Sequence, residues 1–180
     1  LEEFPSIQFS VEMALKSLES FNAFELFPSE FTSGNKSIPI NGLVWMGTEQ
    51  FMHEQIKDKI KAGFTCIKMK IGAEEALEKL KKLSDFDLHS IEQPIKQGRV
   101  KEMAELCNTS PLPIALDEEL IGVFSSENKK ELLQNIKPQY IILKPTLVGG
   151  FHGSNEWIQL AKKNNIGWWI TSALESNIGL

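Results

Sequence analysis

The chain of 180 residues predicts an α/β fold in which helices connect parallel strands, as in a β/α barrel. Strand-like and helix-like segments alternate along it, and several short apolar runs end on charged residues. The main alternative is an open doubly wound sheet. That fold usually carries a glycine-rich phosphate turn after its first strand, and neither a dinucleotide-binding nor a P-loop glycine motif occurs here. The sequence therefore favours the barrel.

The alternation gives six expected strands with helical segments between them. The first helical pattern covers residues 10–21, with Ser10 as a candidate N-cap, and the second covers 48–63, with Gly63 as a C-cap. The expected strands are residues 38–46, 64–70, 88–94, 112–119, 138–145 and 166–172. The other expected helices are residues 73–85, 98–108, 126–136 and 154–165. A complete barrel needs eight strands and about 250 residues, so this one is expected to be incomplete.

Composition narrows the classes of protein. A net charge of -5 without a basic cluster argues against nucleic-acid binding. No apolar run approaches the roughly 20 residues that cross a bilayer, and the first residues lack the pattern of a signal peptide. The two cysteines form neither a disulfide framework nor a metal-binding spacing, so a cytoplasmic protein is expected.

Two acids follow neighbouring apolar runs. Glu92 closes LHSIEQP and Asp117 closes PIALDEE, so both are expected at the carboxyl ends of their strands, where barrel active sites lie. Carboxylates from separate strands suit Mg²⁺, which prefers oxygen ligands. The other reading is that the acids cap the following helices or pair with lysines. The glutamine and proline after Glu92 favour a fixed turn, which suits a site that needs defined geometry.

Three lysines occupy comparable positions. Lys68 and Lys70 alternate with apolar residues, so a strand would direct both to one side. Lys144 ends YIILKP and can approach the same rim. An amine beside other cations and a divalent ion is a candidate general base. For Lys144, a solvent-reaching lysine and a Schiff-base lysine are the alternatives. Because imine chemistry does not need two strand-end acids, metal-assisted proton transfer is preferred.

The ordered motifs KMKIG, IEQPI, PIALDEE, IILKPTLVGG and TSALESNIG together resemble the enolase superfamily, in the branch of the muconate-lactonising enzymes. The resemblance runs from about Phe4 to the last residue. It implies a TIM-type (β/α) barrel preceded by an α+β capping domain. On this basis residues 1–27 would hold the last helix of the capping domain, residues 28–37 a linker, and residues 38–180 an incomplete barrel.

The resemblance also implies a metal site. Glu92 and Asp117 match two ligands of Mg²⁺, and Glu118 matches a neighbouring acid outside the ligand set. Enzymes of this superfamily combine a lysine or histidine base with Mg²⁺ that stabilises an enediolate. The implied substrate is therefore a small carboxylate.

The implied chemistry assigns roles to four further residues. Lys70 would be the acid/base, Lys68 would place positive charge near the substrate carboxylate, and Lys144 would lie across the substrate from Lys70. Ser172 would touch the substrate. The implied reaction is dehydration of 2-succinyl-6-hydroxy-2,4-cyclohexadiene-1-carboxylate to o-succinylbenzoate in menaquinone biosynthesis. A dipeptide epimerase or N-acylamino acid racemase of the same superfamily is one alternative, and an inactive barrel with a binding or structural role is another.

The chain departs from the family pattern in one internal place. The third strand, which should carry a further metal-binding Asp, is absent between KMKIG and LHSIEQP. The eighth strand, the C-terminal tail and most of the capping domain are missing as well. Either the protein is a truncated, inactive variant, or these 180 residues omit stretches of a longer chain. Omission is favoured, because deleting an internal strand would break two rows of backbone hydrogen bonds. Ala73 and Glu74 would then not be true neighbours.

Overall fold

The computed structural model describes residues 3–69, 88–173 and 175, which fall into two compact units. The smaller unit comprises residues 21–74, and the larger comprises residues 1–20 and 75–180. The expected helix at 73–85 and the expected third-strand junction at Ala73 and Glu74 lie outside the described residues. The predicted domain boundaries at residues 27 and 37 stay predictions.

The smaller unit contains one strand–helix–strand crossover. β1 (Gly42–Val44) pairs in parallel with β2 (Ile67–Met69), and α2 (Glu49–Lys61) connects them. The Thr48 hydroxyl accepts a free amide of the first turn of α2, that of Phe51, at 3.3 Å. Gly63 follows the helix with φ +88°, a left-handed conformation that glycine adopts without strain. The structure thus places the C-cap one residue before the predicted one, at Ala62, and Gly63 takes the left-handed position that ends the helix.

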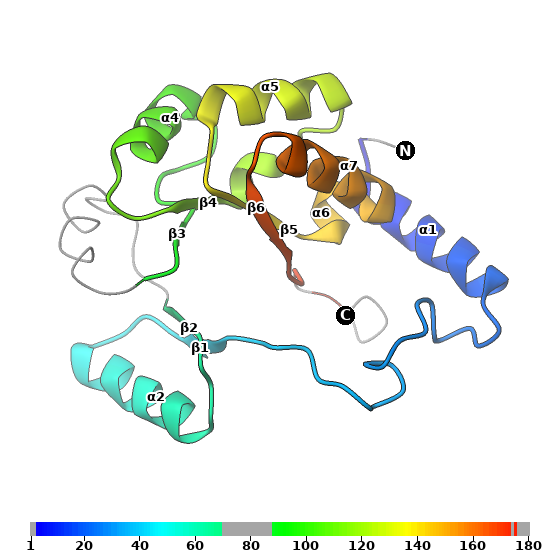
Figure 1. Ribbon diagram of the computed structural model, residues 1–180, viewed down its shortest axis with the longest axis horizontal. Helices are drawn as coiled ribbons and strands as arrows, with labels where there is room; N and C mark the ends of the chain where they lie inside the picture. Colours follow the sequence, from blue (N-terminus) through cyan, green and yellow to red (C-terminus); the bar gives the residue numbers. More distant parts are fainter. Residues whose placement is uncertain (1–2, 70–87, 174, 176–180) are drawn as a thin grey trace. The chain divides into compact units, whose positions relative to one another are not determined.

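The larger unit contains a four-stranded parallel sheet. Its strands follow one another in chain order, each separated from the next by helical segments (Figure 1). The strands are β3 (Ile91–Glu92), β4 (Ile114–Leu116), β5 (Tyr140–Leu143) and β6 (Gly167–Ile170). The helical segments are α4 (Val100–Thr109), the short 3-10 turn η1 (Glu118–Leu120), α5 (Ser126–Ile136), α6 (Pro145–Val148) and α7 (Gly150–Lys163). The predicted alternation and parallel pairing are confirmed.

One face of this sheet is packed against helices α4, α5 and α7 (Figure 1). Alternate strand residues take part because successive side chains of a strand point to opposite faces. From the sheet these are Ile114, Leu116, Ile141 and Leu143. Met103, Leu133 and Trp157 meet them from the helices. Burying this apolar surface is the main favourable contribution to folding of the unit.

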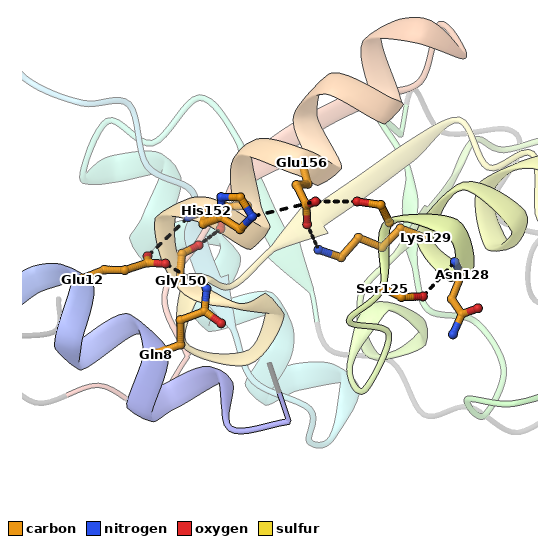
Figure 2. Close-up of polar contacts among 10 residues, drawn as sticks. Gln8, Glu12, Ser125, Asn128, Lys129, Gly150, His152 and Glu156 are labelled. Atoms are coloured by element: carbon orange, nitrogen blue, oxygen red, sulfur yellow. Dashed lines mark hydrogen bonds and ion pairs between the residues drawn. The ribbon is translucent and has the colours of Figure 1, made fainter. Parts of the chain in front are cut away.

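Helix α1 (Pro5–Glu19) packs on α6 and α7 of the larger unit. Phe9 meets Phe151 edge to face, with ring centroids 5.1 Å apart. The Glu12 carboxylate accepts the amides of Phe151 at 2.5 Å and His152 at 3.3 Å, which caps the N-terminus of α7 (Figure 2). A negative charge there also complements the helix dipole.

The expected start of this first helix at Ser10 was wrong. The helix begins at Pro5, whose fixed φ suits the first helical position. Ser10 lies inside the helix and donates its hydroxyl to the carbonyl of Ser6 at 2.9 Å. A serine can bond the carbonyl four residues back as well as it can cap a helix, so the residue type alone did not decide its place.

An ion pair joins α5 to α7. Lys129 is 2% exposed and donates to Glu156 at 2.7 Å. Ser126, at the start of α5, donates to the same carboxylate, and His152 lies 3.9 Å from it (Figure 2).

Within the described ranges, none of the helices combines the length and the apolar character needed to cross a bilayer.

Candidate active site at the strand ends

Three predicted site residues lie at the carboxyl ends of adjacent strands. Glu92 is the last residue of β3, Asp117 follows β4 directly, and Lys144 follows β5 directly. Parallel strands bring these ends to one edge of the sheet. The predicted rim is therefore present in this unit for these three residues.

The strand register places their side chains on one face. Glu92 lies opposite Ala115, and Ala115 lies opposite Tyr140. Because side chains alternate along a strand, Asp117 shares the face of Ala115, and Lys144 shares the face of Tyr140. The neighbours of these residues, such as Leu116 and Leu143, point to the helix-packed core instead. The charged residues thus share the face opposite the one packed on α4, α5 and α7.

Asp117 and Lys144 form a direct ion pair. The Lys144 ammonium donates to the Asp117 carboxylate at 2.5 Å. The aspartate side chain is 2% exposed and the lysine side chain is 20% exposed. This ion pair is the pairing with a lysine that the alternative reading of the strand-end acids expects for Asp117, and the metal-binding role of Asp117 stays a prediction.

Burial raises the pKa of Asp117, because the charged form loses hydration. The hydrogen bond and the charge of Lys144 oppose this effect without cancelling it. The negative charges of Glu118 and Glu92 raise the pKa further. The carboxylates of Glu92 and Glu118 therefore repel that of Asp117. A cation bound beside them would reduce this repulsion and would stabilise the charged form of the poorly solvated Asp117.

The donor set suits a hard divalent cation. Glu92 and Asp117 supply carboxylate oxygens from neighbouring strands, which is the ligand type that Mg²⁺ prefers. In the part of the chain that the structure describes, no three His, Cys, Asp or Glu side chains converge as a metal site. The two carboxylates thus fit the metal by the type of their donor atoms, and their role as ligands stays a prediction.

Three further site residues were predicted, Lys68, Lys70 and Ser172, and the structure describes two of them. Lys68 lies half-buried on β2 opposite Leu43, in the smaller unit. Lys70 lies outside the described residues. Ser172 is exposed just beyond β6, next to Thr171, whose amide donates to Leu143 at 2.9 Å. The roles assigned to these three residues stay predictions.

The two glutamates after Asp117 differ in burial. Glu118 is exposed, while Glu119 is 4% exposed and accepts the amide of Gly98 at 3.1 Å. The role predicted for Glu118 stays a prediction. Sequence reasoning overlooked Glu119, since consecutive acids carry no sign of which one turns inward. The 3-10 turn η1 decides the direction of each side chain.

Gln93 was noticed only as part of a turn. Its side chain in fact bridges the ends of β3 and β4, because its amide oxygen accepts the amide of Asp117 at 3.1 Å. Glu175 is a second overlooked residue: it accepts from the Thr146 hydroxyl at 2.6 Å and from the amide of Ala173 at 3.0 Å. That contact ties the segment of Ser172 to α6. In the sequence, the only indication of a role for Gln93 and Glu175 was their position among the motif residues.

The parallel strands and the acidic rim define a protein of the β/α-barrel class with its site at the strand ends. The sequence profile of the family described as "Enolase C-terminal domain-like" matches residues 72–180. The chain therefore belongs to the enolase superfamily.

Individual relatives agree with this assignment. The chain is 48% identical to a protein of Desulfotalea psychrophila named o-succinylbenzoate synthase, over 98% of this chain and 57% of that protein. The crystal structure of MenC from D. psychrophila LSv54 superposes with a TM-score of 0.90 at 47% identity, covering 98% of this chain and 58% of that one. An N-succinylamino acid racemase of Thermus thermophilus is 30% identical over 57% of this chain and 27% of its own length. The chain thus spans little more than half of the synthase that it resembles.

The alignment with the synthase also bears on the missing segments. It extends over 211 positions, which is more than the 180 residues of the chain. The relative therefore carries residues inside the aligned region that this chain lacks. This agrees with the prediction that a piece of the family pattern is absent internally.

Proposed function

We propose that the chain forms the barrel part of an o-succinylbenzoate synthase, a lyase that removes water from 2-succinyl-6-hydroxy-2,4-cyclohexadiene-1-carboxylate in menaquinone biosynthesis. The observation that carries the proposal is the 48% identity to a protein of that name along 98% of the chain. The positions of Glu92, Asp117 and Lys144 at adjacent strand ends support it.

Glu92 and Asp117 would hold Mg²⁺, with Glu118 as a nearby acid. When bound, Mg²⁺ would polarise the substrate carboxylate and stabilise the enediolate that forms next to it. Lys144, whose ammonium lies 2.5 Å from the Asp117 carboxylate, would serve beside the substrate ring as a fixed positive charge.

Lys70 would carry the proton transfer. It removes the proton from the carbon beside the carboxylate, and the same proton then joins the departing ring hydroxyl to form water. The electron pair of the broken C–H bond completes the aromatic ring as the C–O bond breaks. Lys68 would add positive charge near the carboxylate, and Ser172 would touch the substrate. We also propose the cytoplasm as the compartment, which suits the free cysteines Cys66 and Cys107.

Two measurements test the proposal in sequence. The intact mass of the purified protein is first compared with the 20.3 kDa of these residues, because a larger mass would reveal further segments. Mg²⁺-dependent formation of o-succinylbenzoate is then followed by absorbance. Lys70→Ala should lower kcat by about 10³-fold, within the usual range for a general acid/base. Lys61→Ala, which removes an exposed lysine of α2, is the matched control and should leave kcat unchanged.

The racemase activity remains a second candidate, because a racemase of T. thermophilus is 30% identical over part of the chain. Interconversion of N-succinylamino acid enantiomers without formation of o-succinylbenzoate would favour it. If neither reaction occurs and Mg²⁺ binding does not depend on Glu92 and Asp117, the inactive barrel becomes the correct description.

A further inference from the structure

Gln93 has a backbone conformation that few side chains adopt. Its φ is +39°, in the left-handed region, although it is neither glycine nor asparagine. Such a backbone conformation is strained and persists only where its surroundings fix it. Pro94 follows, and a proline disfavours the ordinary helical conformation for the residue before it. The strained position directly follows Glu92, one of the two carboxylates of the rim.

The side-chain amide of Gln93 is fully used. Its oxygen accepts the backbone amides of Asp117 at 3.1 Å and Glu119 at 3.2 Å. Its nitrogen donates to the carbonyl of Ile95 at 3.1 Å and to the carboxylate of Glu119 at 3.1 Å. An amide group offers two acceptor sites and two donor hydrogens, so all four are satisfied. Few other side chains could make these four bonds.

The bonds join the segments that carry the two acids. The Gln93 backbone amide also donates to Ala115 at 2.9 Å, as part of the strand ladder. Buried Glu119 closes the far side by accepting the amide of Gly98. The Gln93 side chain therefore joins the turn after β3 directly to the backbone of Asp117 and Glu119, which helps to fix the backbone of Asp117 relative to that of Glu92. A metal ion needs this distance to be set before it binds.

We propose that Gln93 is the positioning residue of the divalent-cation site, holding the carboxylates of Glu92 and Asp117 in register through its side-chain amide. This inference rests on the proposed function, because it assumes that the two acids bind a cation. The four hydrogen bonds occupy the whole Gln93 amide, so Gln93 is not counted among the ligands. Its effect passes through the backbone of Asp117 and through Glu119.

The test measures Mn²⁺ affinity and the free energy of unfolding of the same variants. Gln93→Met keeps the length of the side chain and removes all four bonds. Gln93→Asn shortens the side chain while tolerating the left-handed backbone, so it removes the bonds without adding backbone strain. Both should raise the Kd for Mn²⁺ by about 10- to 100-fold, the usual effect of removing a residue that orients metal ligands. Affinity is compared under conditions where each variant is fully folded.

Gln97→Met is the matched control. Gln97 lies on the same turn and donates to the carbonyl of Ile121 at 2.9 Å, but it does not touch the segment of Asp117 to Glu119. It should leave the Kd within about twofold, since it removes no bond to a ligand-bearing segment. If Gln93→Asn binds Mn²⁺ as tightly as the unsubstituted chain, Gln93 serves stability alone and the inference is overturned. If the unsubstituted chain binds no Mn²⁺, or binds it equally without Glu92 and Asp117, the metal site itself is wrong, and the inference falls with it.

Discussion

Two lysine–carboxylate ion pairs in the larger unit have similar N–O distances but differ in which partner is buried. At the strand ends, Lys144 lies 2.5 Å from Asp117, and the acid is the more deeply buried partner. Between α5 and α7, Lys129 lies 2.7 Å from Glu156, and here the lysine is the buried partner. The side chains of Asp117 and Lys129 are each 2% exposed.

The two acids respond in opposite directions. Burial raises the pKa of Asp117, and Lys144 does not fully offset it. Burial also acts to raise the pKa of Glu156, but the hydrogen bonds from Lys129 and Ser126 outweigh it, and the pKa lies below its ordinary value. Glu156 therefore belongs to a closed structural pair. Asp117 is a poorly solvated acid that stands to gain from a stronger cation.

The largest expected effect on stability comes from the structural pair. Glu156→Gln leaves the ammonium of Lys129 buried without an anionic partner. Breaking a buried pair on one side typically costs about 3 kcal/mol or more, because the remaining charge is uncompensated. Urea unfolding followed by circular dichroism should record this loss as a lower midpoint with an unchanged slope.

A double variant identifies the cause of that loss. Lys129→Met combined with Glu156→Gln removes the stranded charge and fills similar volume. It should recover most of the lost stability, since a buried pair can often be replaced by apolar groups at little cost. A double variant no more stable than Glu156→Gln would show that packing, and not the charge, accounts for the loss.

The functional pair should behave in the reverse way. Asp117→Asn should weaken Mn²⁺ binding by at least about 100-fold, which corresponds to about 2.7 kcal/mol of binding free energy. It should change the free energy of unfolding by no more than about 1 kcal/mol, because it removes a poorly solvated charge and Lys144 is exposed enough to reach water. Calorimetric titration and urea unfolding of one sample separate the two quantities. If Asp117→Asn lowered the free energy of unfolding as much as Glu156→Gln does, the division into a functional pair and a structural pair would be contradicted.

The pH dependence of stability is a further test of the comparison, with a smaller expected effect. Because the pKa of Glu156 is depressed in the folded state, its contribution to stability is fully present above about pH 4.3, the ordinary value for Glu, and is lost as the pH falls through the folded pKa. The stability difference between the unsubstituted chain and Glu156→Gln should therefore shrink below that pH. Urea midpoints measured from pH 7 downward would record it. A difference that stays constant with pH would contradict the assignment.

An exposed pair gives the smallest effect. Arg99 and Glu102 lie 3.0 Å apart on the surface of α4, three residues apart in the sequence. Solvent screens such pairs and the side chains lose entropy when they meet. Glu102→Gln should therefore leave the unfolding midpoint unchanged within replicate scatter, and a clear shift would mean that distance alone predicts the strength of these pairs.

The sequence predicted those features that depend on periodicity. Apolar runs ending on Glu92, Asp117 and Lys144 fixed both the strands and the edge where these residues meet. Alternation along each strand then gave their common face. The fold class followed from the same repetition of strands and helices, and the structure and the relatives confirm it.

Features that depend on contacts between distant segments could not be read in this way. The direct bond between Lys144 and Asp117 spans 27 residues, and the bond from Gln93 to the amide of Asp117 spans 24. The burial of Glu119 depends on the path of a short 3-10 turn. Local sequence sets which residues approach a rim, and tertiary packing sets which of them touch.

The cap that Glu12 provides for α7 has a consequence during protein synthesis. The amides that it accepts lie 139 and 140 residues later in the chain. At ordinary rates of translation, α1 leaves the ribosome on the order of ten seconds before its partners exist. A helix of 15 residues is only marginally stable alone in water. Until α6 and α7 have been made, its apolar side, including Phe9, stays exposed to solvent. Helix α1 therefore docks only after α7 has been made, and until then its apolar side is exposed to aggregation and to chaperones.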